Sequence, residues 1–124
     1  MKVLDLSVNL FRRYEQVREV NAYYGLMALY GLVKTAEASG DPWTLTLAQR
    51  YLARYPDAMK HPRYNFENYR IGGNPQMYAH LRGLVTGKED LLRLYAEETL
   101  RAPADRDGIL CMPRCPEKEQ IWID

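Results

Sequence analysis

The sequence has few cysteines, no excess charge of either sign and no apolar run long enough to cross a bilayer. Its 124 residues include two cysteines, and 17 Lys and Arg balance 16 Asp and Glu for a formal net charge of +1. This balance gives no general attraction to phosphate backbones or anionic lipid, because such attraction requires clustered Lys and Arg. We therefore expect a protein that binds neither nucleic acid nor membranes.

The apolar stretches also argue against a membrane span and a secretion signal. The longest of them, residues 22–33, is too short for a bilayer and contains two glycines and three tyrosines. Residues 1–11 contain Asp5 and Asn9, where a signal peptide needs an unbroken apolar region. We expect a cytoplasmic location.

Cys111 and Cys115 are separated by three residues, a spacing that could supply two metal ligands. A zinc site needs four protein ligands, or three and a water, and His61 and His80 lie far away in the chain. We expect two free thiols in a reducing compartment, and neither a metal nor a cofactor.

Hydrophobic periodicity predicts helices over most of the chain. In residues 6–20 apolar side chains recur every three or four positions, which indicates an amphipathic helix. Its predicted buried face consists of Leu6, Leu10, Phe11, Tyr14 and Val17. In residues 21–39 apolar side chains cover every side, so we expect an inner helix that other helices enclose.

A turn signal separates this inner helix from the next one. Gly40 suits the left-handed position after a helix, Asp41 suits a cap, and Pro42 suits a first turn. The next helix is predicted over 43–55 and ends before Pro56. Its predicted inward residues are Leu47, Ala48, Tyr51, Leu52 and Tyr55.

The second half of the chain shows a similar arrangement. Asn74-Pro75 marks a helix start, Thr86-Gly87 marks a turn, and Pro103 marks an end. We predict helices over 75–86 and 88–101, the second with Leu91, Leu92, Tyr95 and Thr99 inward. The remaining segments, 56–74 and 102–121, are predicted to be irregular.

Two pentapeptides suggest an internal repeat, LYGLV at residues 29–33 and LRGLV at residues 81–85. We interpret them as parts of a repeated unit of inner helix, turn and outer helix. Such units bury their inner helices only by stacking on one another. The prediction is an all-α fold of repeated antiparallel helical hairpins, forming a single domain over residues 1–124.

The connection between the two hairpins, residues 57–74, is unusually long and rich in bases and aromatic residues. Long ordered loops carry function more often than short ones. The residues concerned are His61, Arg63, Tyr64, Phe66, Tyr69 and Arg70. His80, in contrast, falls within a predicted inner helix, where we expect a buried, hydrogen-bonded core histidine.

Two stretches carry a resemblance to a known family. They are PRYNFENYRIGGNP at residues 62–75, and GILCMP at residues 108–113 followed by EQIWID at residues 119–124. Together with the hairpin pattern they resemble the N-terminal part of the unsaturated uronyl and rhamnogalacturonyl hydrolases, glycoside hydrolase families 88 and 105. Those enzymes are six-hairpin (α/α)6 barrels. The resemblance implies that this chain forms the first part of such a barrel.

The resemblance also implies a reaction and a catalytic residue. In that family a Trp-x-Asp motif carries the acid/base aspartate, and the matching residues are Trp122 and Asp124. The carboxylic acid protonates the C4=C5 double bond of a 4,5-unsaturated uronic sugar, and water then adds at C5. The hemiketal opens with loss of the glycosidic link. One residue serves as acid and then as base if its pKa lies near the working pH.

Five residues are candidates for binding the oligosaccharide: Asn74, Trp122, His61, Arg63 and Tyr69. An arginine such as Arg63 suits the two oxygens of a uronate. Structural roles remain open for several of them. Asn74 also fits a helix start, Trp122 also fits a core, and His61 and Arg63 also fit a solvated loop.

A different class of function remains open as well. A non-catalytic α-hairpin module would use its tyrosine-rich inner helices to bind a partner helix or a second copy of itself. If the chain is instead part of a six-hairpin ring, Tyr23, Met27, Tyr30 and Tyr78 lack the neighbours that cover them in the whole ring, and this apolar patch promotes homo-oligomers. Because Asp124 is the last residue, we expect the isolated 124-residue chain to be inactive as an enzyme.

Overall fold

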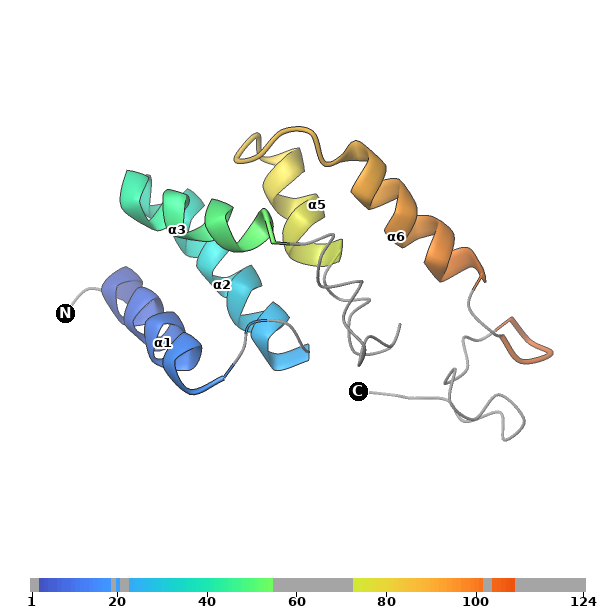
Figure 1. Ribbon diagram of the computed structural model, residues 1–124, viewed down its shortest axis with the longest axis horizontal. Coiled ribbons are helices and arrows are strands. Elements are labelled where there is room, and N and C mark those ends of the chain that lie inside the picture. The colour runs from blue at the N-terminus through green and yellow to red at the C-terminus, as the bar shows by residue number, and fades with distance from the viewer. Residues whose placement is uncertain (1–2, 19, 21–22, 55–72, 102–103, 109–124) are drawn as a thin grey trace.

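The computed structural model describes residues 3–18, 20, 23–54, 73–101 and 104–108, which form an all-helical structure. The helices are α1 (Val3–Val17), α2 (Tyr23–Ser39), α3 (Pro42–Leu52), α5 (Gly73–Leu81) and α6 (Glu89–Arg101) (Figure 1). The described ranges contain no strand, so the predicted all-α class is confirmed. None of the helices in these ranges has both the length and the apolar character that crossing a membrane requires.

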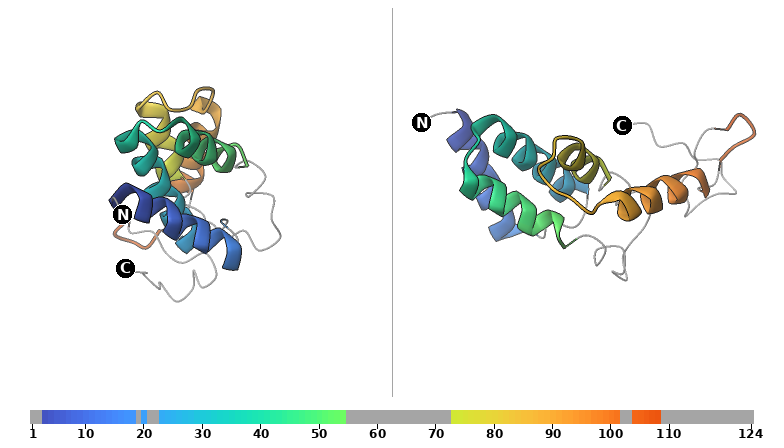
Figure 2. Two further views of the ribbon diagram at one scale, coloured as in Figure 1. Left: turned by 90° about the vertical axis from the view of Figure 1, so that its left-hand side faces the viewer. Right: turned by 90° about the horizontal axis from the view of Figure 1, so that it is seen from above.

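Helix α2 is the central element of the described part. It contacts α1, α3 and α5, and α5 in turn contacts α6. Figure 1 shows α2 and α5 running in the same general direction, while α6 returns the opposite way. In the right-hand view of Figure 2, α6 projects away from the group formed by α1, α2 and α3. The described helices thus form an open row and not a closed ring.

The core forms where α2 packs against its neighbours. Leu26 and Leu29 are completely buried, and Leu32 and Val33 are nearly so. The other four helices of the described part contribute Phe11, Leu47, Ala48, Tyr51, Leu52, Ala79, Leu91 and Tyr95. Burial of one leucine side chain contributes about 1.5–3 kcal/mol. Leu47, Ala48, Tyr51 and Leu52 are all buried, so the predicted inward side of α3 is confirmed for these four residues. The fifth predicted residue, Tyr55, lies outside the described residues.

The turn between α2 and α3 has the chemistry that the sequence predicts. Gly40 has a φ of 62°, a left-handed value that glycine adopts without a Cβ penalty. The Asp41 carboxylate accepts hydrogen bonds from the Thr44 backbone N–H at 2.8 Å and from the Thr44 hydroxyl at 2.6 Å. Pro42 begins the helix, where its missing N–H costs nothing. The turn ends α2 and starts α3, and Figure 1 shows α3 running back in the direction opposite to α2.

Helix α5 ends at Leu81, so the prediction of a helix over 75–86 is wrong at this end. Gly83 has a φ of 67°, and its N–H donates to the His80 carbonyl at 3.0 Å. The Leu84 N–H donates to the Ala79 carbonyl at 2.9 Å. This pair of bonds is a Schellman motif, which closes a helix around a left-handed glycine.

The two pentapeptides therefore differ in conformation. Gly31 lies inside α2, where its carbonyl accepts a hydrogen bond from the Thr35 hydroxyl at 2.9 Å. Gly83 lies beyond the end of α5. The sequence similarity reflects similar composition, and it does not place the two segments at equivalent positions of a repeated helix.

Helix α1 runs over Val3–Val17 instead of the predicted 6–20, and its buried face is narrower than predicted. Phe11 is buried, but Leu10 and Val17 are 62% and 60% exposed. The reason is the position of the neighbouring helices, because α2 and α3 cover only the side of α1 that carries Phe11.

Helix α2 is likewise not enclosed on every side, contrary to the prediction. Tyr24 is 75% exposed and Met27 is 46% exposed. The side of α2 that carries Leu26, Leu29 and Val33 is buried in the core. The opposite side carries Tyr24, Met27 and Lys34, and we call it the open face of α2. Its side chains are exposed in the described structure.

Candidate functional site

Only one of the six predicted site residues lies in the described part of the chain. This residue is Asn74, in the first turn of α5, and its side chain is exposed. The other five, His61, Arg63, Tyr69, Trp122 and Asp124, lie outside the described residues. Cys111 and Cys115 lie outside them too, and the described residues contain no group of three potential metal ligands.

The contact between α2 and α5 contains a cluster of aromatic and charged side chains. The rings of Tyr30 and Tyr78 meet edge to face, with centroids 5.4 Å apart and an angle of 75° between their planes. The Lys34 ammonium lies 5.0 Å from the Tyr30 ring centroid and 5.1 Å from that of Tyr78. An ammonium group at these distances is attracted by the negative face of each ring.

A carboxylate completes this cluster. Glu37 accepts a hydrogen bond from the Tyr78 hydroxyl and lies 3.0 Å from the Arg82 Nε atom. The hydrogen bond with Tyr78 and the charge of Glu37 raise the pKa of Arg82. Since Glu37 is engaged by both groups, its main effect is to fix the tyrosine and the arginine.

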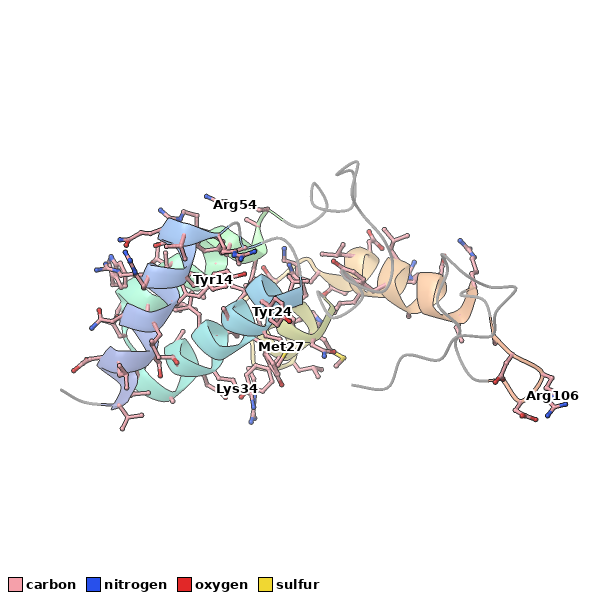
Figure 3. The ribbon with its side chains drawn as sticks, turned by 90° about the horizontal axis from the view of Figure 1, so that it is seen from below. Tyr14, Tyr24, Met27, Lys34, Arg54 and Arg106 are labelled. Atoms are coloured by element: carbon pink, nitrogen blue, oxygen red, sulfur yellow. The ribbon has the colours of Figure 1, made fainter. Side chains whose placement is uncertain are left out.

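Lys34 differs from Arg82 because it has no carboxylate partner among the described residues. Its side chain is exposed and extends away from the ribbon in Figure 3, which also labels Tyr24 and Met27 on the same helix. The cluster thus combines one exposed ammonium group with two half-buried tyrosine rings beside α2.

The sequence analysis did not select Lys34 as a site residue, although a signal was present. Lys34 and Glu37 are the only charged residues of α2, an otherwise apolar helix of 17 residues. A base in the middle of such a helix requires a polar environment or a partner. Tyr30 lies one turn before Lys34 on the same helix, but the position of Tyr78 depends on the contact between α2 and α5, which periodicity does not predict.

A second polar cluster lies where α3 ends, beside the turn between α5 and α6. The Gln76 and Lys88 side chains both donate to the Leu52 carbonyl, at 2.9 and 3.2 Å, and Gln49 donates to the Leu84 carbonyl at 2.7 Å. Burial lowers the pKa of Lys88. These groups satisfy the carbonyls of Leu52 at the end of α3 and of Leu84 in the turn after α5, beside a groove of about 480 Å³.

His80 is not the fully buried, hydrogen-bonded histidine that the sequence suggests. Its side chain is about one-quarter exposed, and its Nε2 atom lies 3.8 Å from the Glu89 carboxylate. Its Nδ1 atom is buried without a hydrogen-bond partner in the described part. The contact with Glu89 joins α5 to α6, and nothing in this geometry indicates ligand binding.

Comparison with known proteins adds no further assignment. No family model, no curated protein and no solved structure matches the chain.

Proposed function

We propose that this chain is part of a carbohydrate hydrolase that removes a 4,5-unsaturated uronic sugar from an oligosaccharide. The single observation that carries the proposal is the cluster of Lys34, Tyr30 and Tyr78 beside the open face of α2. An exposed ammonium group without a carboxylate partner in the described part is suited to the carboxylate of a uronic acid. Tyrosine rings supply apolar surfaces on which the C–H groups of a sugar can pack.

The resemblance of residues 62–75 and 108–124 to the unsaturated uronyl hydrolases supplies the chemical part of the proposal. In this mechanism Asp124, as a carboxylic acid, donates its proton to the C4=C5 double bond. The resulting carboxylate accepts a proton from the water that adds at C5, and the hemiketal then releases the remaining saccharide. Asp124 thereby returns to its acid form, and no cofactor takes part.

The helix arrangement is compatible with this proposal. α2 contacts α3, α5 contacts α6, and α2 and α5 contact each other, which is compatible with two neighbouring helical hairpins. Asn74 stands at the start of α5, directly after the segment that contains His61, Arg63 and Tyr69. In the proposal these residues position the sugar, and Trp122 contacts it beside Asp124.

The test uses the intact gene product and a 4,5-unsaturated uronyl disaccharide. Hydration of the double bond removes its conjugated chromophore, whereas an ordinary glycosidase leaves this chromophore unchanged. Asp124→Asn keeps the side-chain shape but has no transferable proton, so we expect turnover to fall roughly 10²–10⁴-fold. Asp90→Asn is the matched control, because the Asp90 side chain is 97% exposed and its carboxylate lies 3.7 Å from Arg93 on the same helix. Equal turnover in the two variants would contradict the role of Asp124.

A second function is favoured by a specific observation, the exposed apolar side chains of α2 and α5. Tyr24 and Met27 on α2, and Met77 and Leu81 on α5, are all 46% exposed or more. Exposed apolar groups on adjacent helices are typical of interaction surfaces. In this alternative the chain is a non-catalytic module that pairs with a second copy. It predicts concentration-dependent dimers in sedimentation that Tyr24→Lys abolishes, and no loss of the chromophore.

A further inference from the structure

A groove of about 400 Å³ lies between α1 and α3, apart from the cluster beside the open face of α2. Its lining combines one indole ring with charged and hydrogen-bonding groups from the two helices. The lining residues are Arg12, Glu15, Gln16, Trp43, Thr46, Leu47 and Arg50.

An exposed indole and a guanidinium group form one side of this groove. The guanidinium carbon of Arg12 lies 4.0 Å from the centroid of the Trp43 ring, and Trp43 remains 46% exposed. Arg12 has no carboxylate partner among the described residues. Stacking on the ring therefore orients the guanidinium while its N–H donors stay available along the groove.

The carboxylate in the groove is already engaged. Glu15 accepts a hydrogen bond from the Tyr51 hydroxyl and lies 3.8 Å from the Arg50 guanidinium. The Tyr51 ring packs edge to face on Phe11, with centroids 5.1 Å apart, and burial raises the pKa of its hydroxyl group. Because Glu15 balances one of the two arginines, the groove keeps one positive charge.

Two neutral groups complete the lining. The Thr46 hydroxyl donates to the Pro42 carbonyl at 2.8 Å, which leaves its oxygen free to accept. The side-chain amide oxygen of Gln16 accepts a hydrogen bond from the Arg13 guanidinium at 3.3 Å. The N–H groups of the same side-chain amide can then donate to a bound molecule. The groove therefore presents a flat apolar ring, an oriented cation, an acceptor and a donor within one concave surface.

We infer that this groove binds an acidic saccharide. The carboxylate of a uronic acid unit pairs with the Arg12 guanidinium, which matches its two oxygens. The C–H face of the sugar lies against the exposed surface of Trp43, and its hydroxyl groups bond to Thr46 and Gln16. The carboxylates of an acidic peptide could also pair with the arginine. Such a peptide lacks, however, the combination of a C–H face for the indole and hydroxyl groups for Thr46 and Gln16. This inference does not depend on the proposed hydrolysis.

The test is a calorimetric titration of the full chain with saturated tetragalacturonate, which has no C4=C5 double bond. We expect saturable binding that weakens by about tenfold or more in Arg12→Gln, because a charge-assisted hydrogen-bond pair is lost. Trp43→Leu removes the ring and weakens binding as well. Arg93→Gln on α6, an exposed site outside the groove, is the control and binds as the unchanged protein does. Far-ultraviolet circular dichroism of each variant verifies that the helices are retained.

Four results would overturn the inference. They are no saturable binding, equal binding of neutral maltotetraose, equal binding of a tetraglutamate peptide, and unchanged affinity in a folded Arg12→Gln variant. Failure of the proposed hydrolysis is separate from all of them. Asp124→Asn tests hydrolysis and leaves affinity for tetragalacturonate unchanged, whereas Arg12→Gln tests the groove and leaves turnover of the unsaturated disaccharide unchanged.

Discussion

Replacing each of the two matched glycines by alanine should change stability in opposite directions. Gly31 and Gly83 occupy the same place in LYGLV and LRGLV, but Gly31 lies inside α2 and Gly83 has a φ of 67°. A Cβ added at either position meets no atom within 4 Å, so packing does not contribute to the difference. The effect of each substitution therefore comes from the backbone alone.

The two magnitudes follow from this backbone difference. In a helix interior, alanine is more stable than glycine by roughly 0.5–1 kcal/mol, so Gly31→Ala should stabilise the fold. In the left-handed region an alanine Cβ costs roughly 1–2 kcal/mol, so Gly83→Ala should destabilise it. A change of 1 kcal/mol shifts the melting temperature of a domain of this size by about 4 °C.

Urea and thermal unfolding, followed by far-ultraviolet circular dichroism, measure both effects. The expected result is a higher midpoint for Gly31→Ala and a lower one for Gly83→Ala. If both substitutions shifted the midpoint in the same direction, the two pentapeptides would have equivalent conformations. The description of Gly83 as the end of α5 would then be wrong.

Two further predictions concern the core and the turn between α2 and α3. Leu29→Ala should lower the free energy of unfolding by about 2–5 kcal/mol, because Leu29 is completely buried. Leu81→Ala is the control and should change this free energy by less than about 0.5 kcal/mol, because Leu81 is 73% exposed. Chemical denaturation checks both, and comparable losses would contradict the described core. Hydrogen bonds from the Thr44 hydroxyl and backbone lower the pKa of Asp41 below its ordinary value of 3.8. Its charge therefore stabilises the fold above that pH, and the contribution disappears as the pH falls through the folded-state pKa. Asp41→Asn should accordingly be less stable than the unchanged protein at pH 7, with the difference shrinking in acid, and a difference independent of pH would contradict this cap.

The sequence predicts local features well where a single residue type determines the backbone. The turn at Gly40, Asp41 and Pro42 is an example, because glycine, a capping carboxylate and proline each suit one position of it. The inward side of α3 is another, because its apolar period of 3.6 residues matches one buried face. All of these features depend on neighbours within a few residues along the chain.

Features that depend on tertiary contact are predicted less well. Leu10 and Val17 have the right period for a buried face, but no described helix covers their side of α1. Gly83 looks the same as Gly31 in sequence, yet hydrogen bonds to His80 and Ala79 make it a helix end. The groove at Arg12 and the cluster at Lys34 each combine side chains from two helices, so no single segment reveals them.

The most direct test of the proposed function measures whether Lys34 recognises the carboxylate of the substrate. The experiment determines kcat and KM of the intact gene product for a 4,5-unsaturated uronyl disaccharide and for its methyl ester, which has no negative charge. The same constants are measured for Lys34→Gln. This pair of changes forms a double-mutant cycle between the ammonium group and the carboxylate.

We expect Lys34→Gln to raise KM for the acid about tenfold or more with little change in kcat, because a binding interaction is lost and Asp124 is retained. The methyl ester should bind weakly to the unchanged protein and equally weakly to the variant. If Lys34→Gln raised KM for the acid and the ester by the same factor, or left KM for the acid unchanged, Lys34 would not bind the uronate. Absence of chromophore loss with the unchanged protein would contradict the proposed hydrolase itself.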